Sequence, residues 1–487
     1  DEAQDTSKIQ HNIIALLAGR YENLFMVGDE DQSIYGFRAA YPEALLSFEK
    51  NHPDAQILLM EENFRSNANI VTAADRFIQK NEFRHKKNMR PTRKPGTQIK
   101  EIEIKNRKAQ YSYLAKMAAD CDAQTAVLYR DNESILPVVD LLERQGIPYR
   151  MKNADLTFFS HRVVMDISDI IRFALTPWST ELFLKIYYKI GMYLNKNAAM
   201  EACRCSMESD CDVLDAALTY VELPAGTQKS VKAMQTHLSN LINERADKAL
   251  YRIVNFMGYG DYLERMHVKD TKIPILEAIA ANEPHVERLL LRLEELAATI
   301  REKEYVRDCN LIFSTIHSSK GLEYDTVYLL DAMDGVFPET VIKDRKRASQ
   351  DDLKLYEEER RLFYVGVTRA KNQLVLFKKE MGTTFIDELM GRESLKPAYP
   401  VKTTTPISKQ VQTGYGEASG RKSKKRIVTE SEYLDKLEEI QTTGYVKHKT
   451  YGEGRVESIA GDILLVEFPQ KTVKCKLKFM LEQGLIE

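Results

Sequence analysis

The chain of 487 residues has few of the features that would assign it at once to a class of protein. Its six cysteines, at positions 121, 203, 205, 211, 309 and 475, are too few and too scattered for a disulfide framework. Three of them are close in sequence (203, 205 and 211), but no fourth ligand stands nearby, so free thiols are favoured over a metal site. No apolar stretch approaches the roughly 20 residues of a membrane span. These absences predict reduced thiols, a cytoplasmic location and no membrane partner.

An excess of charge of either sign is also missing, since Lys+Arg number 70 and Asp+Glu number 72. A bulk basic field that would hold nucleic acid is therefore excluded. Any contact with nucleic acid must come from local basic or aromatic stripes.

A phosphate-binding loop is the third absence. The string G-x-x-x-x-G-K-[ST], whose backbone amides and lysine hold nucleotide phosphates, occurs nowhere in the chain. The chain nevertheless opens on DEAQD, in which Asp1 and Glu2 are adjacent carboxylates of the kind that bind Mg²⁺ and activate water in nucleotide hydrolases. We therefore expect a fragment of a longer protein that begins inside a nucleotide site and is inactive alone.

The pattern of apolar residues indicates a mixed α/β fold. Residues 9–17 have helical spacing that Gly19 can end, residues 24–27 form a short apolar run, residues 41–50 read as helical, and residues 57–60 form another apolar run. Strands that alternate with helices predict a parallel sheet, whose ligands gather at the carboxyl ends of the strands. Polar clusters follow both of the predicted strands.

Further along, the α/β pattern is interrupted and then resumes. A strand at 125–129 and a helix at 134–145 are followed by long, leucine-rich helical stretches such as 286–298. Core strands return at 311–313, 326–330 and 374–377. This order predicts a helical insertion within one α/β domain.

The last part of the chain differs in composition. A Thr/Ser/Gly/Lys-rich stretch that contains RKSKKR at 421–426 has few apolar residues to offset the entropy of ordering, which predicts a flexible linker. Short strands and glycine turns after residue 444 predict a small β-barrel. The predicted organisation is 1–93, the remainder of a first α/β domain; 94–155 with 306–398, a second; 156–305, the helical insertion; 399–440, the basic linker; and 441–487, the barrel.

Four polar clusters stand out beyond the opening motif: 28–38 (GDEDQSIYGFR), 62–66 (ENFRS), 315–323 (TIHSSKGLE) and 357–370 (EEERRLFYVGVTRA). Each has an ordinary explanation when it is taken singly. An acidic pair at a strand end is often a turn or a helix cap, and a lone arginine usually forms a weak surface ion pair. The aromatic residues and His317 would more often be structural, and the glutamate run would be a solvated helix face.

Together, and in this order, the motifs resemble those of the UvrD/Rep-type superfamily-one DNA helicases. The opening DEAQD is similar to the family's Walker B box, and the four clusters resemble its motifs III, IV, V and VI. The resemblance extends from residue 1 to about 390, and residues 444–468 resemble the Tudor-like tail of the PcrA/UvrD branch. It implies two RecA-like domains, of which the first is partial here.

The resemblance also implies a site for ATP and Mg²⁺ between these two domains. The implied roles are a Mg²⁺ ligand (Asp1), the base that orients water (Glu2), a γ-phosphate sensor (Gln32), two arginine fingers (Arg65 and Arg369), an adenine-stacking ring (Phe64) and a ribose acceptor (Glu323).

A second set of residues is implied to contact DNA. Tyr35, Phe37 and Arg38 would form a base-stacking step, with Phe37 where the family usually has tryptophan. Base stacking suits a motor, because it tolerates any sequence. Backbone contacts are implied for Thr315, His317 and Lys320, with a further contact at Tyr129 and Arg130.

The implied function is an ATP-dependent 3′–5′ DNA helicase or translocase of DNA repair or replication restart, acting on single-stranded DNA and on junctions of single- and double-stranded DNA. The tail resembles barrels that dock on RNA polymerase. Two alternatives are the helicase part of a helicase–nuclease, although no acidic nuclease cluster follows residue 390, and a non-catalytic DNA- or polymerase-binding protein. The insertion is short for the family, which leaves its duplex contacts open.

Overall fold

The structure is a computed structural model that describes residues 1–19, 23–121, 123–151, 155–269, 271–302, 309–342, 347–392, 436, 439–440, 442–449, 452–460, 463–468, 471–482 and 486. The chain divides into two compact units, Asp1–Pro406 and Ile407–Glu487. Within the described residues, no helix combines the length and the apolar character that crossing a bilayer requires.

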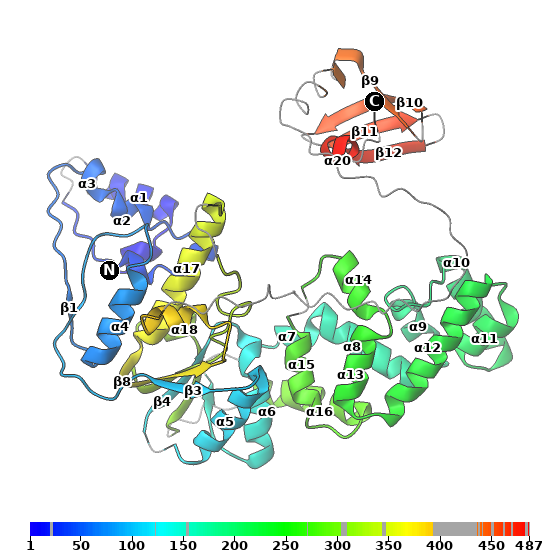
Figure 1. The fold of residues 1–487 in the computed structure, drawn as a ribbon, viewed down its shortest axis with the longest axis horizontal. Helices are drawn as coiled ribbons and strands as arrows, with labels where there is room; N and C mark the ends of the chain where they lie inside the picture. The colour runs from blue at the N-terminus through cyan, green and yellow to red at the C-terminus, as the bar shows by residue number, and fades with distance from the viewer. Residues whose placement is uncertain are drawn as a thin grey trace. The chain divides into compact units, whose positions relative to one another are not determined.

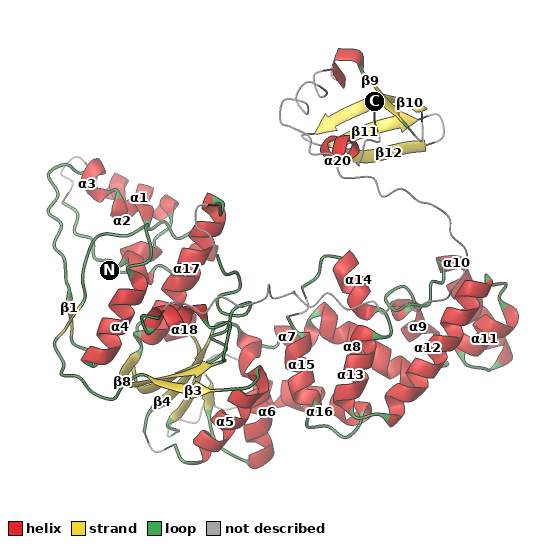
Figure 2. Ribbon diagram, in the orientation of Figure 1, coloured by secondary structure: helices red, strands yellow, loops and turns green. Residues whose placement is uncertain are grey.

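A six-stranded parallel sheet forms the centre of the first unit (Figure 2). In spatial order its strands are β3 (Lys100–Glu103), β8 (Ala370–Lys378), β7 (Tyr324–Leu329), β4 (Thr125–Tyr129), β6 (Leu311–Thr315) and β5 (Arg150–Met151). The strand expected at 125–129 is confirmed in place, and those expected at 311–313, 326–330 and 374–377 form within slightly longer or shifted strands. The predicted mixed α/β class with a parallel-sheet core is thus present.

Side chains alternate along the strands between two hydrophobic clusters, as the two-residue period of a strand requires. In β4, Val127 and Tyr129 face the cluster that contains α5 (Arg107–Ala119) and α6 (Leu136–Gln145). Ala126 and Leu128 face the cluster that contains α4 (Ala68–Ile78), α17 (Gln350–Val367) and α18 (Thr384–Leu389). The sheet is therefore covered on both faces, which explains why its strands read as continuous apolar runs.

Short elements make up most of the first 93 residues. They are η1 (Ala3–Asp5), α1 (Lys8–Ala18), η3 (Glu30–Gln32), η4 (Gly36–Arg38), α2 (Glu43–Leu46), α3 (Phe48–Asn51), β1 (Glu62–Asn63) and β2 (Arg90–Pro91), with α4 between β1 and β2. Helix α1 begins at a capping box, in which Ser7 and Gln10 each bond the other's backbone amide, and it ends at Gly19 as expected.

Two of the predicted elements in this region are wrong. Residues 24–27 and 57–60 form no strand, and most of their side chains are exposed, with Phe25 86% and Met60 88% accessible. An apolar run becomes a strand only when a neighbouring strand completes its hydrogen-bond ladder, and no described residue does so here. The single helix expected at 41–50 is two short ones, which meet at Ser47, where the backbone (φ −105°, ψ 10°) departs from helical values.

Helix α4 packs with the sheet rather than with residues 1–60. Phe77 is fully buried, and its ring centroid lies 5.3 Å from those of Phe363 in α17 and Phe385 in α18. Figure 1 shows α4 (blue) beside α17 (yellow), although nearly 300 residues separate them. The expected domain boundary at residue 93 therefore lies after α4, a helix that packs on the six-stranded sheet of the expected second domain.

In the described part of residues 157–302 the regular elements are all helices, joined by turns and loops, which agrees with the helical character predicted for 156–305. The helices are α7 (Thr157–Ser160), α8 (Arg162–Leu175), α9 (Thr180–Ile186), α10 (Lys196–Ser209), α11 (Val213–Tyr220), α12 (Ala225–Asn243), α13 (Ala246–Asn255), α14 (Tyr259–Arg265), α15 (Ile273–Ala280) and α16 (Val286–Glu302). Their buried side chains continue the cluster on the α5–α6 face of the sheet.

The second unit contains a four-stranded antiparallel sheet in the order β12 (Lys471–Lys476), β11 (Ile463–Phe468), β10 (Gly452–Ala460) and β9 (Tyr445–His448), followed by α20 (Leu477–Glu482). Leu464, Val466 and Phe468 supply the core of this sheet. Closure of the sheet into a barrel remains a prediction. The predicted linker at 399–440 lies almost wholly outside the described residues.

Replacing Phe77 by alanine should lower the free energy of unfolding of the first unit by about 3–5 kcal/mol, because it removes a fully buried ring that joins α4 to α17 and α18. Urea denaturation followed by circular dichroism measures this loss. Replacing Phe83, which is 43% exposed, by alanine is the matched control and should cost much less. Equal losses in the two variants would show that α4 does not hold the sheet as described.

Candidate functional site

The guanidinium of Arg369 is the most deeply buried charge among the predicted site residues. Arg369 is 1% exposed and donates to the carbonyl oxygens of Val365 (3.0 Å) and Leu322 (3.2 Å) and to Oε1 of Gln32 (3.3 Å). Among the described residues, no carboxylate forms an ion pair with it. Burial and the nearby charge of Arg65 lower the pKa of Arg369 to about 10.

Arg65 and Glu323 lie beside Arg369. Glu323 and Arg369 each stand just before a strand, and the pairing of Tyr324 with Ala370 sets them next to each other. Arg65 Nε donates to Oε2 of Glu323 at 2.9 Å, and its Nη1 donates to the carbonyl oxygen of Thr368 at 3.4 Å. The two predicted arginine fingers therefore meet at residues 368–369, next to the predicted ribose acceptor.

Gln32 connects this corner to the loop at residues 28–38. Its Nε2 donates to Oδ2 of Asp29 at 2.7 Å, while its Oε1 accepts from Arg369. Both ends of the amide are thus engaged, which fixes its orientation. The structure brings together Gln32, Arg65, Glu323 and Arg369, and their catalytic and binding roles remain predictions.

The opening motif lies next to Gln32 through a lysine. Lys320 Nζ donates to Oδ2 of Asp5 (2.5 Å) and to the carbonyl oxygen of Gln32 (2.8 Å), and it lies 3.3 Å from Oε2 of Glu2. Its side chain is only 7% exposed. A DNA-backbone contact by Lys320 remains a prediction, but in this structure its charge is directed to the acidic motif.

The same motif offers oxygen atoms suited to a hard cation. Asp1 and Glu2 are exposed, and Glu2 adopts a left-handed backbone conformation, φ 55°. Burial raises the pKa of Asp5, against the effect of Lys320. Among the described residues, nothing donates a hydrogen bond to the buried Oδ1 of Asp5. Carboxylate oxygens of this kind fit Mg²⁺, which prefers oxygen ligands and keeps several waters.

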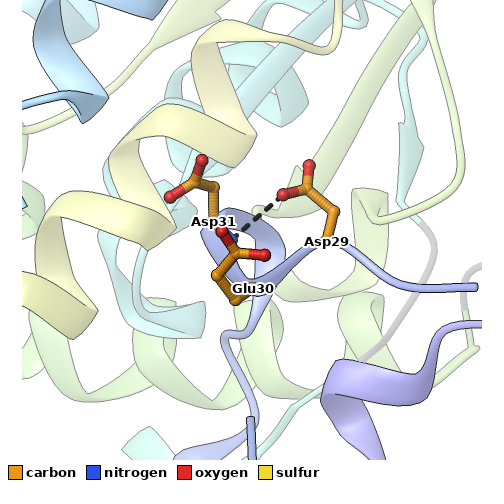
Figure 3. A group of neighbouring side chains, drawn as sticks. All are labelled: Asp29, Glu30 and Asp31. Carbon is orange, nitrogen blue, oxygen red and sulfur yellow. Dashed lines mark hydrogen bonds between the residues drawn. The ribbon is translucent and has the colours of Figure 1, made fainter. Parts of the chain in front are cut away.

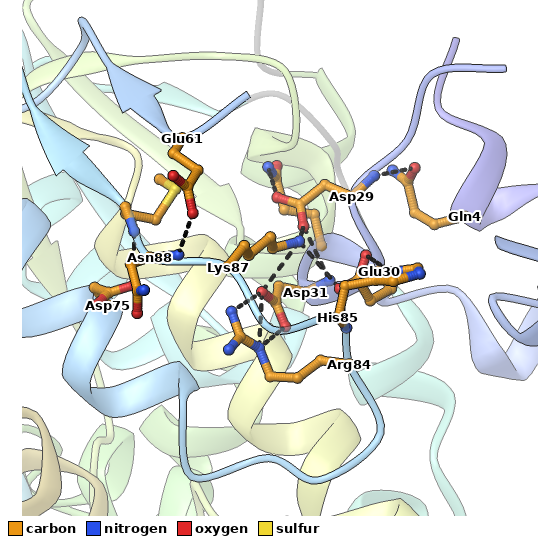
Figure 4. Close-up of polar contacts among 12 residues, drawn as sticks. Gln4, Asp29, Glu30, Asp31, Glu61, Asp75, Arg84, His85, Lys87 and Asn88 are labelled. Carbon is orange, nitrogen blue, oxygen red and sulfur yellow. Dashed lines mark hydrogen bonds and ion pairs between the residues drawn. The ribbon is translucent and has the colours of Figure 1, made fainter. Parts of the chain in front are cut away.

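A second acidic group, Asp29, Glu30 and Asp31, is neutralised by the protein itself (Figure 3). Lys87 Nζ lies 2.5 to 3.3 Å from all three carboxylates, and Arg84 forms two-pronged contacts with Asp31 (Figure 4). Although burial alone favours the neutral amine, the three carboxylates raise the pKa of Lys87. This group is a buried ion-pair network rather than a metal site.

An aromatic cluster lies at the other end of the loop. The ring centroid of Phe37 is 5.9 Å from that of Tyr35 and 5.4 Å from that of His317, and the guanidinium of Arg38 lies over both Tyr35 and Phe37. Phe37 is 68% exposed. Burial lowers the pKa of His317, which favours its neutral form. A half-exposed set of rings flanked by an arginine is suited to stacking on nucleic-acid bases.

Other predicted DNA contacts are placed differently. Tyr129 is 2% exposed and belongs to the hydrophobic core, so its assignment as a DNA contact is wrong: the last residue of β4 points inward. Arg130 is held by Glu359 (2.8 Å) and Glu339 (3.2 Å). The hydroxyl of Thr315 accepts from the amide of Ser318 and so shapes the turn after β6.

Phe64 is 71% exposed, so its ring is available for stacking. Adenine binding by Phe64 remains a prediction.

Two family models match the chain. The model of the UvrD-like helicase C-terminal domain matches residues 58–222 and 273–380, which is more than half of the chain. The chain belongs to the UvrD-like helicases. The model of the UvrD/REP helicase N-terminal domain matches residues 1–53. The C-terminal model starts shortly before α4, in agreement with the packing of that helix on the sheet.

Individual relatives of this UvrD-like helicase are distant. ATP-dependent DNA helicase PcrA of Staphylococcus epidermidis is 26% identical over 94% of the chain and 65% of its own length. PcrA of Staphylococcus aureus is 25% identical over 94% of the chain and 66% of its own length. Putative ATP-dependent DNA helicase YjcD of Bacillus subtilis is 28% identical over 77% of the chain and 50% of its own length. The chain thus spans about half to two thirds of these relatives.

Sequence reasoning missed three sets of contacts in this UvrD-like helicase. It did not connect Lys320 to the opening motif, or Lys87 and Arg84 to residues 29–31. It also missed two contacts of α17 with the loop: Glu358 accepts from the amide of Gly36, and Arg361 donates to the carbonyl of Ser33. The basic composition of 84–108 was a signal for the second set, because three consecutive acidic residues that become buried need cations nearby.

Replacing Arg84 by methionine should lower the free energy of unfolding by about 3 kcal/mol, because it leaves Asp31, 2% exposed, as a buried charge with a weakened partner. Replacing Asp31 by leucine in the same chain should recover part of the loss. Urea denaturation measures both. The control is Arg90→Met, at the exposed pair with Glu61, which should leave stability unchanged within error. A double variant less stable than Arg84→Met would contradict the pairing.

Proposed function

We propose that the chain forms the motor part of an ATP-dependent DNA helicase or translocase that hydrolyses ATP and moves along single-stranded DNA. The observation that supports this most is the loop at 28–38. Gln32 at its start bonds the buried Arg369, while Tyr35, Phe37 and Arg38 form an exposed aromatic cluster a few residues later. One short loop therefore connects a phosphate-directed corner to a base-stacking surface.

The phosphate-directed corner fits the role of an anion site. A desolvated guanidinium with no carboxylate partner among the described residues is expensive, and an arriving γ-phosphate would provide the missing negative charge. Arg65 reaches the same corner but is paired with Glu323. When ATP binds, we expect this pair to separate, with Arg65 turning to phosphate and Glu323 to the ribose. Such arginine fingers are typically worth roughly 10³–10⁵ in rate.

Glu2 would orient the attacking water, with its carboxylate set by Gln4 and Lys320. Asp1 would hold Mg²⁺, which neutralises charge on the phosphates when it is bound. Phe64 would stack on adenine. His317 and Thr315 would contribute on the DNA side.

Three finer assignments rest on the family resemblance and are part of the proposal: the 3′–5′ direction, a role in DNA repair or replication restart, and binding of RNA polymerase by the last unit. The alternative is a non-catalytic DNA- or polymerase-binding protein. The network around Gln32 and Arg369 favours a motor, because a binding scaffold has no need of a buried guanidinium without a carboxylate partner among the described residues.

Phe37→Ala should weaken binding to an oligo-dT strand by about tenfold, because one base–aromatic stack contributes about 1–3 kcal/mol. Arg369→Ala should leave this affinity within about twofold of the wild type, because its guanidinium faces Gln32 rather than the aromatic cluster. Fluorescence anisotropy at one fixed salt concentration measures both affinities. Arg369→Lys, with a thermal melt of each variant, controls for unfolding. Equal losses in the two variants would refute this division of roles.

The 487-residue polypeptide assayed by itself should release phosphate from ATP at background rate, with or without oligo-dT. Its residues include no G-x-x-x-x-G-K-[ST] loop to hold the β- and γ-phosphates. A phosphate-release assay beside a full-length PcrA checks this expectation. DNA-stimulated turnover within about tenfold of PcrA would show that another group in this chain takes over the role of that loop.

A further inference from the structure

Helix α17 holds the loop at 28–38 by its backbone at two points. Nε of Arg361 donates to the carbonyl oxygen of Ser33 at 3.1 Å, and Oε1 of Glu358 accepts from the amide of Gly36 at 3.1 Å. Residues 358 and 361 lie three apart and so share one face of the helix. The bonded groups of the loop are also three residues apart, so the helix spans the part of the loop between Gln32 and Phe37.

The bond from Glu358 replaces a missing helix cap. The short helix η4 begins at Gly36, and the residue before it, Tyr35, offers no side-chain acceptor to the first amides. Such amides have no partner within their own helix. Glu358, from a segment more than 300 residues away, accepts from the first of them. The turn is closed by its own backbone bonds, from Arg38 to Tyr35 (2.8 Å) and from Ala39 to Gly36 (2.9 Å), and the carboxylate adds a contact from outside it.

The approach is close, and the absence of a side chain at Gly36 leaves room for it. A Cβ at position 36 would lie 2.4 Å from Oε1 of Glu358 and 2.9 Å from its Cδ. A larger residue therefore requires the carboxylate to shift, which disturbs its bond to the Gly36 amide. Gly36 and Glu358 are thus two sides of one contact, which can be tested from either side.

The same helix leads to the phosphate-directed corner. Arg369 follows α17 by two residues, donates back to Val365 and bonds Gln32. Figure 1 shows α17 running alongside the N-terminal segment that carries the loop. A shift of α17 would therefore move Gln32, Ser33 and Gly36 together.

We propose that Glu358 is a positioning residue that fixes the Tyr35–Phe37 stack in the orientation on which DNA bases stack, by capping the Gly36 amide. This inference rests on the proposed binding of single-stranded DNA. Beyond that proposal, it names Glu358 as the residue through which a movement of α17 would reach the Tyr35–Phe37 stack.

The test uses five versions of the full chain: wild type, Glu358→Ala, Glu358→Gln, Gly36→Ala and the double variant Gly36→Ala/Glu358→Ala. Affinity and base stacking are read from an oligo-dT strand that carries one 2-aminopurine, whose fluorescence falls when it stacks. Hydrogen exchange of the segment 34–39 in the DNA-free protein reports the cap directly. Asp351→Ala, an exposed acid in the first turn of the same helix, is the matched charge control.

Glu358→Ala and Gly36→Ala should each weaken DNA binding by about tenfold, reduce the quenching and speed exchange of 34–39. The double variant should lose no more than either single change, because both break one contact. Glu358→Gln retains an acceptor oxygen and should stay within about twofold of wild type, as should Asp351→Ala. If Glu358 only stabilised the fold, Glu358→Ala would also lower the melting temperature. A positioning role instead predicts an unchanged melting temperature, with DNA binding restored by Glu358→Gln.

If the wild type binds oligo-dT and Glu358→Ala has the same affinity and the same exchange rate as the wild type, the inference is overturned. The proposed function would still stand. Additive losses in the double variant would overturn it as well. If the wild type fails to bind oligo-dT, the proposed function itself fails, and the positioning role fails with it.

Discussion

The burial of the Arg369 guanidinium is the constraint on which the rest of the site depends. A charge taken out of water costs several kcal/mol unless hydrogen bonds and opposite charge compensate for it. Here neutral oxygens provide the hydrogen bonds, from Val365, Leu322 and Gln32. They hold the side chain in one direction but leave its charge largely uncompensated. This imbalance among the described residues lowers the pKa of Arg369, and under the proposed function an anion would supply the missing negative charge.

Other buried charges in the first unit, unlike Arg369, are paired with charges of opposite sign. The carboxylates of residues 29–31 face Lys87 and Arg84, and Asp5 faces Lys320. Around residues 29–31 the carboxylates and cations balance one another, so this group stabilises the loop without offering a site to a ligand. Arg369, in contrast, has hydrogen bonds but no carboxylate partner among the described residues. The two groups of charges therefore differ in whether they are balanced, and the number of charged residues in the sequence does not report this difference.

The sequence predicted the central sheet well because its signals are local. The run at 125–129 is flanked by turns and became β4 at the same residues. The runs at 24–27 and 57–60 look the same in sequence but form no strand, because a ladder depends on neighbours that local pattern does not report. The motifs picked out Gln32, Arg65, Glu323 and Arg369, which the structure places together, while their roles remain predictions. They could not predict which way Tyr129 points or that Lys320 turns to Asp5, since both depend on packing between distant segments.

The packing of α4 has a consequence for how the chain is made. Its buried face needs α17 and α18, and Asn81, just after it, bonds Arg360, 279 residues further along. At 5–20 residues per second, a ribosome would take roughly 15–60 s to supply that partner. During that interval the apolar side of α4, including Ile70, Phe77 and Ile78, has no sheet to cover it. During biosynthesis, the apolar face of α4 therefore needs cover from chaperones or from transient contacts with the nascent chain until α17 is made.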